Sequence, residues 1–358
     1  MTGLGYRFGH ALEGLTPGYF ALVMATGILS VGMDLEDVDL LSNALLGVCI
    51  AAGVVLAVLT SCRFLAYPAA VVDDFTDPRR GFGFFTFVAG TNVLGVRLGL
   101  EGWHAATVIL LVLAGVAWLV LGYVVPWTAV LGRQDRPVVA SANGTWFIWV
   151  VASQSVAVGA ATIEPVYDSA RRDLAVLAVL AWSVGVFLYA ATGIFVALRL
   201  MLYDFGPEDL TPPYWVSMGA LAITVLAGAR IVEMADAPMV RVTRDLIAGV
   251  AVVFWAFATW LIPVLIAAGW WRHIRRRIPM LYDATLWSMV FPLGMYAVAG
   301  IYLGGADQLP VVEAIGRGEL WVAFVVWLVV FTAMFLHIAD TVFRNAPRRQ
   351  GEKATGSG

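Results

Sequence analysis

The stretch that decides the fold is YFALVMATG at residues 19–27, where an aromatic pair opens an apolar run that ends in small residues. Four similar stretches follow at intervals of 62 to 72 residues. They are FFTFVAGTN at 84–92, WFIWVVASQ at 146–154, YWVSMGALA at 214–222 and LWSMVFPLG at 286–294. Each is followed by a second and more hydrophobic run, which gives ten apolar segments in five pairs. A fivefold repeat of helical hairpins predicts five equivalent helices around an axis with five more outside them, and an axis of this kind suits a pore.

The chain of 358 residues is 61% hydrophobic and only 13% charged, so lipid must be part of its solvent. We therefore expect an all-α integral membrane protein with ten transmembrane helices, arranged as five helical hairpins with quasi-fivefold symmetry around a central pore. Residues 1–346 are expected to form a single transmembrane domain, and residues 347–358 a disordered polar tail. The expected spans are 17–33, 43–66, 81–98, 103–132, 143–163, 174–201, 212–230, 246–271, 284–303 and 320–343.

Arginine counting predicts the orientation. With ten spans, one side of the membrane receives both termini and fifteen of the 22 Lys and Arg residues, including the cluster at 272–277. The other side receives seven, and its first loop, 34–39, has no basic residue. The positive-inside rule then places the protein in the inner (plasma) membrane with both termini in the cytoplasm. It also explains the basic cluster without a nucleic-acid partner, and we expect none.

Alignment of the five repeats also predicts which residues line the pore. We align the first helices of the five pairs on Phe20, Phe85, Phe147, Trp215 and Trp287, and expect positions four, seven and ten residues on to share the face that lines the pore. Most of these positions carry small or amide side chains. The predicted pore-lining residues are Met24, Gly27, Ser30, Ala89, Asn92, Gly95, Val151, Gln154, Gly219, Ala222 and Gly294. Close packing between helices and interhelical hydrogen bonds are the alternative use of these residues.

Phe291 is the one bulky residue on this face, and Pro292 follows it at an expected kink. A ring at that position would fill the lumen as a gate, or would be a core aromatic if the helix is rotated away. Arg97 and Arg230 close two of the first helices and are expected to attract anions at the pore mouth, or to anchor the helices at the interface. Glu101 and Glu233 are their expected ion-pair partners.

The residue types inside the predicted spans exclude several functions. No Asp, Glu or Lys lies in the middle of an expected span, which excludes a retinal protein and disfavours a tightly ion-coupled carrier. Only His337 lies well inside a span, and no metal-ligand spacing occurs. We expect no enzymatic step, no cofactor and no metal.

LTPGYFALVMATGIL at residues 15–29 and WSMVFPLG at 287–294 together resemble the tellurite-resistance/dicarboxylate transporter family. That family includes bacterial tellurite-resistance proteins, fungal malate and sulfite transporters and guard-cell slow anion channels. The resemblance implies a homotrimer with one pore in each protomer, closed by the phenylalanine that corresponds to Phe291. It implies small inorganic anions or C4-dicarboxylates such as malate as the substrates.

These observations favour a gated anion channel with a neutral pore that is lined by the first helix of each pair and occluded by Phe291. The alternative is a C4-dicarboxylate or sulfite exporter, possibly proton-linked. Channel flux should reverse at a potential set by anions alone, whereas carrier flux should saturate and depend on a second ion.

Overall fold

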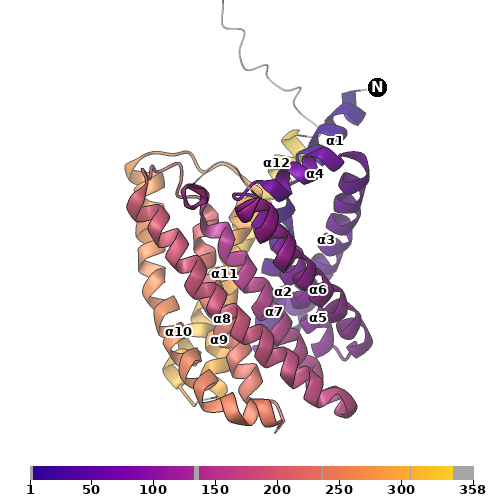
Figure 1. The fold of residues 1–358 in the computed structure, drawn as a ribbon. Helices are drawn as coiled ribbons and strands as arrows, with labels where there is room; N and C mark the ends of the chain where they lie inside the picture. Colours follow the sequence, from indigo (N-terminus) through magenta and orange to yellow (C-terminus); the bar gives the residue numbers. More distant parts are fainter. Residues whose placement is uncertain (1–2, 133–136, 236, 307, 342–358) are drawn as a thin grey trace, which may run out of the picture.

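The computed structural model describes residues 3–132, 137–235, 237–306 and 308–341, and its regular elements are helical throughout (Figure 1). Ten helical segments of the described residues are long and apolar enough to span a membrane, which confirms the expected all-α architecture. The predicted tail at 347–358 lies outside the described residues. The α-helices are α1 (Gly3–Glu13), α2 (Ala21–Leu35), α3 (Asp39–Ala66), α4 (Pro68–Thr76), α5 (Phe85–Leu100), α6 (His104–Val125), α7 (Phe147–Ile163), α8 (Arg171–Leu202), α9 (Val216–Val232), α10 (Pro238–Trp270), α11 (Trp287–Ala306) and α12 (Pro310–Ala339).

The first helices of the five hairpins, α2, α5, α7, α9 and α11, form a closed ring. Each packs against the next in chain order, and α11 packs against α2 to complete the circle. We call these the inner helices. Their most apolar stretches are 72 to 89% buried, whereas those of the partners α3, α6, α8, α10 and α12 are only 17 to 33% buried. The second helices therefore form an outer layer that faces lipid, as expected for helices that are apolar all round.

The inner helices begin alike because the same chain chemistry precedes each of them. A short 3₁₀ turn leads into every inner helix: Pro17–Phe20, Gly81–Phe84, Gly144–Trp146, Pro212–Trp215 and Ala284–Leu286. Side-chain oxygens of Asn143 and Asp283 accept hydrogen bonds from the backbone two residues on, each at 2.8 Å. Proline occupies the first position of two other turns, where its missing N–H costs nothing. The aromatic residue on which each repeat is aligned thus lies at a defined helix start.

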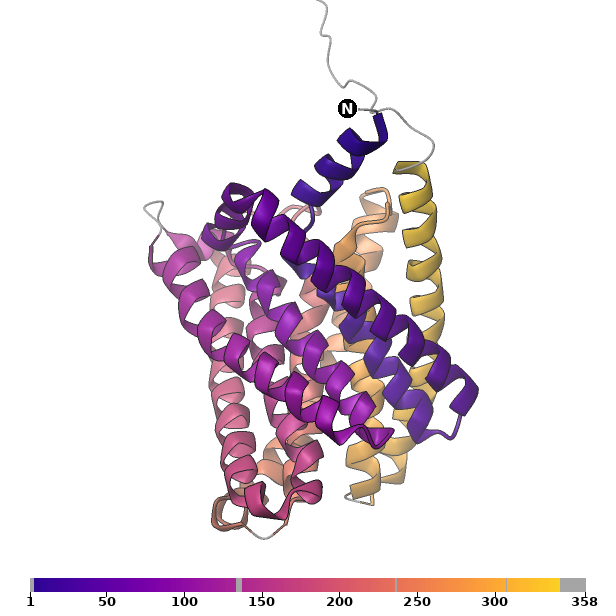
Figure 2. The same ribbon diagram turned by 90° about the vertical axis from the view of Figure 1, so that its right-hand side faces the viewer.

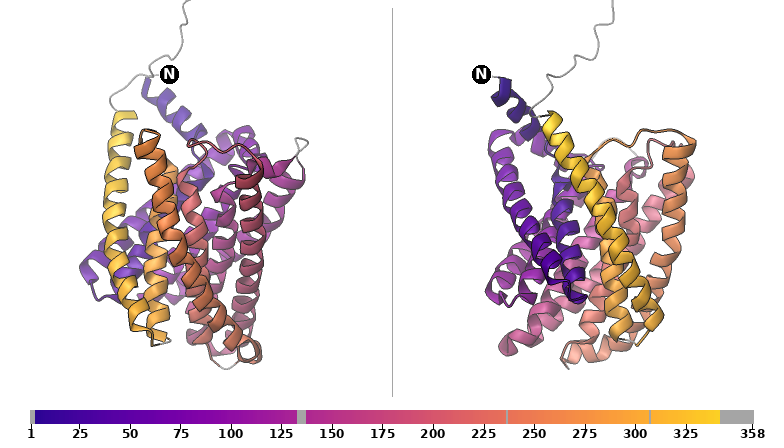
Figure 3. Two further views of the ribbon diagram at one scale, coloured as in Figure 1. Left: turned by 90° about the vertical axis from the view of Figure 1, so that its left-hand side faces the viewer. Right: turned by 180° about the vertical axis from the view of Figure 1, so that it is seen from behind.

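Both ends of the described chain lie on one side of the bundle, where α1 projects from it (Figures 1 and 2). We call this the terminal side; it is the side that the arginine count predicts to be cytoplasmic. Viewed from the other directions, α12 runs along α11 from the opposite side back to the terminal side (Figure 3).

The outer helices are longer than their charge-free stretches suggested. α12 begins at Pro310, ten residues before the expected start at 320, and α10 begins at Pro238 rather than 246. Proline at the first helical position starts both, and the charged residues of their first turns stay within the helix. The length of a stretch without charged residues therefore underestimates the length of these two helices.

Candidate functional site: a cavity on the axis of the inner ring

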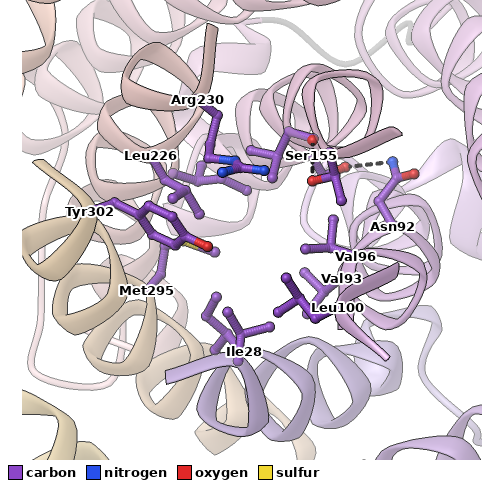
Figure 4. A pocket seen from close by; sticks show the side chains of 14 residues that line it. Ile28, Asn92, Val93, Val96, Leu100, Ser155, Leu226, Arg230, Met295 and Tyr302 are labelled. Carbon is purple, nitrogen blue, oxygen red and sulfur yellow. Dashed lines mark hydrogen bonds between the residues drawn. The ribbon is translucent and has the colours of Figure 1, made fainter. Parts of the chain in front are cut away.

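The axis of the ring holds a cavity in the half that lies away from the termini. Its volume is small: the centre of a water molecule can occupy about 20 Å³ of it, and all five inner helices contribute side chains to its wall (Figure 4). Most of the wall is apolar, and the polar groups are few. The lining residues are Ile28, Val31, Asn92, Val93, Val96, Leu100, Ser155, Val158, Thr162, Ile223, Leu226, Arg230, Met295 and Tyr302.

Equivalent positions of the five inner helices line the cavity, as the repeat predicts, but they are other positions than the predicted ones. All the lining residues except Asn92, which lies at position seven, lie eight, eleven or fifteen positions after the aligned aromatic residues. We call the five equivalent positions of the inner helices a row and name it by its distance from the aligned aromatic residue. In the row at eight all five members line the cavity: Ile28, Val93, Ser155, Ile223 and Met295. Because each helical residue turns by about 100°, these three rows lie within about 40° of the row at four. The row at seven is about 60° away and the row at ten about 120° away.

Most predicted residues of the rows at seven and ten face neighbouring helices instead of the cavity. A Cβ on Gly27 would lie 2.7 Å from Val93 Cγ1, and one on Gly95 would lie 3.3 Å from Leu110 Cβ on α6. A Cβ on Gly294 would approach Ile28 at 3.0 Å. These glycines serve close helix packing, which was the alternative use of small residues.

Of the polar residues in the rows at seven and ten, two bind outer helices and one lines the cavity. Ser30 donates to the backbone oxygen of Ser42 on α3 at 2.8 Å, and Gln154 Nε2 donates to the Trp182 carbonyl on α8 at 3.1 Å. Both side chains therefore bind the outer layer, and Ala222 of the row at seven is also buried. Asn92 alone among the rows at seven and ten lines the cavity, where Nδ2 donates to Ser155 Oγ at 2.9 Å. Its Oδ1 is buried and has no hydrogen-bond partner among the described residues.

The row at four lies one turn deeper toward the terminal side, on the face that continues the cavity wall. Met24, Ala89, Val151 and Gly219 occupy it together with Phe291, and all five residues are buried. Phe291 is the only aromatic member. Gly219 packs against Pro292, since a Cβ there would lie 2.8 Å from the proline Cγ. The cavity does not extend to this row.

Arg97 is fully buried and does not lie at an open mouth, contrary to the expectation for it. Its guanidinium pairs with Glu101 at 2.8 Å, as predicted, and with Asp34 at 3.0 Å. It also donates to Ser30 at 2.9 Å and Ser42 at 2.8 Å. Arg97 thereby joins α2, α3 and α5, and sequence did not indicate this because the partners come from three segments.

Arg230 does face the cavity, from the last turn of α9. Its Nη1 lies 3.2 Å from Glu233 Oε2, which confirms the predicted pair, and its guanidinium lies 5.3 Å from the centre of the Tyr302 ring on α11. Figure 4 shows the guanidinium and the Tyr302 hydroxyl pointing into the same space. Among the 14 lining residues of the described chain, Arg230 is the only one with a formal charge.

This architecture agrees with the comparison of the chain with known families. Residues 14–335 match the family described as voltage-dependent anion channels. The chain belongs to the voltage-dependent anion channel family. This is a family of membrane transport proteins, not of enzymes.

Alignments with curated relatives cover different shares of this member of the anion channel family. An uncharacterized membrane protein of Mycobacterium tuberculosis is 61% identical over 159 residues, which are 44% of this chain and 81% of the relative. Two uncharacterized transporters of Methanocaldococcus jannaschii are 21% and 23% identical, and each alignment spans 89% of this chain and over nine-tenths of the relative.

Sequence reasoning did not consider one acid of α12, Glu319. It lies ten residues into α12, inside the tenth candidate span, and is only partly exposed. A Cβ on Gly316 would lie 2.7 Å from the Ala297 carbonyl, so Glu319, about one turn on, is level with the middle of α11. No described residue forms an ion pair or hydrogen bond with it. The expected span began at residue 320 and left Glu319 just outside it, whereas α12 begins at Pro310 and includes it.

Proposed function

We propose that the protein is a gated anion channel whose pore runs along the axis of the inner ring and is occluded by Phe291. The observation that carries the proposal is the cavity formed by equivalent positions of all five inner helices. Family membership supports the anion as the transported species.

The chemistry of the wall supports anions over cations. The lining contains no carboxylate and one guanidinium, that of Arg230, whose partner Glu233 is not among the lining residues; the rest of the wall is neutral and largely apolar. A fixed positive charge concentrates anions at an entrance and repels cations. Asn92 Nδ2 keeps a second N–H beside the one that it donates to Ser155, and this neutral donor can partly replace a hydration shell. The hydroxyls of Ser155 and Thr162 donate to backbone carbonyls of their own helix. A wall with so little fixed charge binds weakly and releases quickly, which suits conduction.

The proposed gate is the row at four. Phe291 lies on the same face of α11 as the cavity residue Met295, one turn toward the terminal side. The other helices place Met24, Ala89, Val151 and Gly219 at that level, none of which is aromatic. A single ring among smaller residues fills a narrow axis and can leave it by a change of rotamer or by a bend at Pro292. We further propose that small inorganic anions or C4-dicarboxylates pass, that the termini are cytoplasmic, and that the protein forms a homotrimer with a pore in each protomer.

Anion currents in planar bilayers test this function. Wild type and Phe291→Ala are compared in chloride, nitrate, malate and sulfite gradients. The expected result is a large current in the variant with a reversal potential that follows the anion gradient. Phe187→Ala is the matched control, because that ring lies on α8 and is 79% exposed toward the lipid. Equal, negligible currents from folded Phe291→Ala protein would refute the gate.

Glu319 favours a second candidate, a proton-linked exporter of C4-dicarboxylates or sulfite. A carboxyl group at mid-membrane depth without a charged partner is a common protonation site in coupled carriers. Proteoliposome uptake distinguishes the two functions. Saturable flux that follows an imposed pH gradient and is lost in Glu319→Gln would support the carrier; flux unaffected by pH gradient and by this substitution would support the channel.

A further inference from the structure

The end of the cavity at the row at fifteen contains an arrangement that a simple lining does not require. Arg230 is held from two sides: the Glu233 carboxylate pairs with Nη1, and the Tyr302 ring lies against the guanidinium. Among the described residues, Glu233 is the only group that accepts a hydrogen bond from Arg230. The remaining N–H groups of the guanidinium are left for the cavity. Figure 4 shows the Tyr302 hydroxyl on the same side.

The ion pair between Arg230 and Glu233 is partly exposed to solvent, and this exposure has a consequence. The Arg230 side chain is 22% exposed and that of Glu233 is 44% exposed, so the ion pair lies at the boundary between cavity and solvent. A pair in such a position is weak and can exchange its partner. The Tyr302 contact, in contrast, comes from a neighbouring inner helix and stays in place when Glu233 moves. Arg230 can therefore keep its position in the cavity while it changes its carboxylate partner for an anion from solution.

The shape of the guanidinium selects the class of anion. Its planar fork of N–H groups binds two oxygens of one group at once, which a single halide ion does not offer. Nitrate, sulfite and carboxylates share this pair of oxygens on one atom, and the Tyr302 hydroxyl can donate a further hydrogen bond. The subsite thus suits small oxyanions over chloride.

We propose that Arg230 and Tyr302 form an oxyanion-loading subsite at the outer end of the pore, and that Glu233 is a built-in competitor for it. This inference rests on the proposed function, since it names the substrate class of the same cavity. An incoming oxyanion displaces Glu233 from Arg230, so the carboxylate weakens loading and speeds release. Glu233 thereby sets the affinity of the subsite, and Arg230 sets its preference.

Thermal unfolding of the purified protein tests the subsite without any conduction. Chloride is replaced by nitrate at constant ionic strength, and the Tm is recorded against nitrate concentration, because a ligand that binds the folded state raises Tm by mass action. Wild type should show a saturable rise. Arg230→Gln should abolish it, and Arg230→Lys should lose the preference for nitrate over chloride while it retains the charge. Glu233→Gln should reach half-saturation at about tenfold less nitrate, the effect of one charge-assisted hydrogen bond.

Arg172→Gln is the control, because it removes one exposed positive charge on the same side of the protein and should leave the curve unchanged. A nitrate response retained in Arg230→Gln, or a weaker one in Glu233→Gln, would overturn the proposal. Currents through Phe291→Ala separate it from the channel hypothesis. A nitrate response that depends on Arg230 without any current would leave the subsite standing and refute the channel; a current with a response that ignores Arg230 would do the reverse.

Discussion

The two halves of the inner ring are built from the same five helices and differ in what fills the axis. In the half away from the termini, aliphatic and small polar side chains leave a small cavity, in which the centre of a water molecule can occupy about 20 Å³. In the terminal half, the cavity stops before the row that contains Phe291. Aromatic rings also stack between the helix starts there, as Phe82 with Trp146 at 4.9 Å and Phe85 with Trp149 at 5.9 Å.

The comparison shows that one repeated backbone supplies a half with a cavity on its axis and a half in which the cavity stops, which we call the closed half. The closed half is also drawn together by the backbone, because a Cβ on Gly144 would overlap the chain at Pro213. Tyr19 and Tyr282 share a hydrogen bond of 2.8 Å across the starts of α2 and α11. The difference between the halves is therefore one of side chains and helix starts, and substitutions in each half should have different effects.

The largest expected effect separates two residues on one face of α11. Phe291→Ala should raise anion current by more than about tenfold, because it removes the ring that closes a hydrophobic constriction. Met295→Ala, one turn on in the cavity wall, should change the current by less than about twofold, since the axis is already open there. Single-channel conductance of the two variants is the measurement. Similar increases in both would place the constriction elsewhere.

The next largest effect concerns the two arginines in the half that contains the cavity. Arg97→Met should lower the free energy of unfolding by about 3–5 kcal/mol, because it leaves Asp34 and Glu101 without their buried partner. Arg230→Gln, at the boundary with solvent, should cost no more than about 1 kcal/mol. Unfolding of both variants by denaturant in detergent micelles checks the contrast. Equal losses would show that Arg97 is not the connector of α2, α3 and α5.

A smaller effect is expected at the helix contact that holds the proposed gate. Gly219→Ala should destabilise the protein by about 1–3 kcal/mol, because the new methyl group would lie 2.8 Å from Pro292. Gly115→Ala is the control, since nothing lies within 4 Å of a Cβ at that position of α6. That substitution should be neutral or stabilising, because alanine favours the helix over glycine. The Tm of both variants would show whether the closed half is the more tightly packed.

The smallest effect is expected at the terminal edge of the closed half. Burial raises the pKa of the Tyr282 hydroxyl, so this group stays protonated at neutral pH and available for the bond with Tyr19. Tyr19→Phe should cost about 0.5–1.5 kcal/mol, the usual net contribution of one hydrogen bond. Trp287 Nε1 still donates to Tyr282 at 3.2 Å and limits the loss. Tm again provides the measurement, and a loss as large as that of Arg97→Met would mean that this bond organises the whole helix start.

The sequence alone determined the ten spans and their arrangement as five hairpins. It also determined the division into inner helices rich in small residues and more hydrophobic outer helices. It also predicted the partners Glu101 and Glu233, because each lies within one helical turn of its arginine. Local spacing is sufficient for such features, since helix periodicity and hydrophobic length depend on neighbouring residues only. The roles assigned to Phe291 and to the row at four remain predictions.

Only the tertiary structure decided how each inner helix is rotated. Small side chains suit a pore wall and a helix contact equally well, so Gly27 and Gly95 could not be assigned from their identity. Their direction follows from packing against Val93 and Leu110, residues of other segments. The same holds for Arg97, which is buried by α2 and α3, and for Glu319, whose depth is fixed by the approach of Gly316 to α11. The physical reason is that rotation and depth are properties of contacts between helices, and no single segment of sequence contains them.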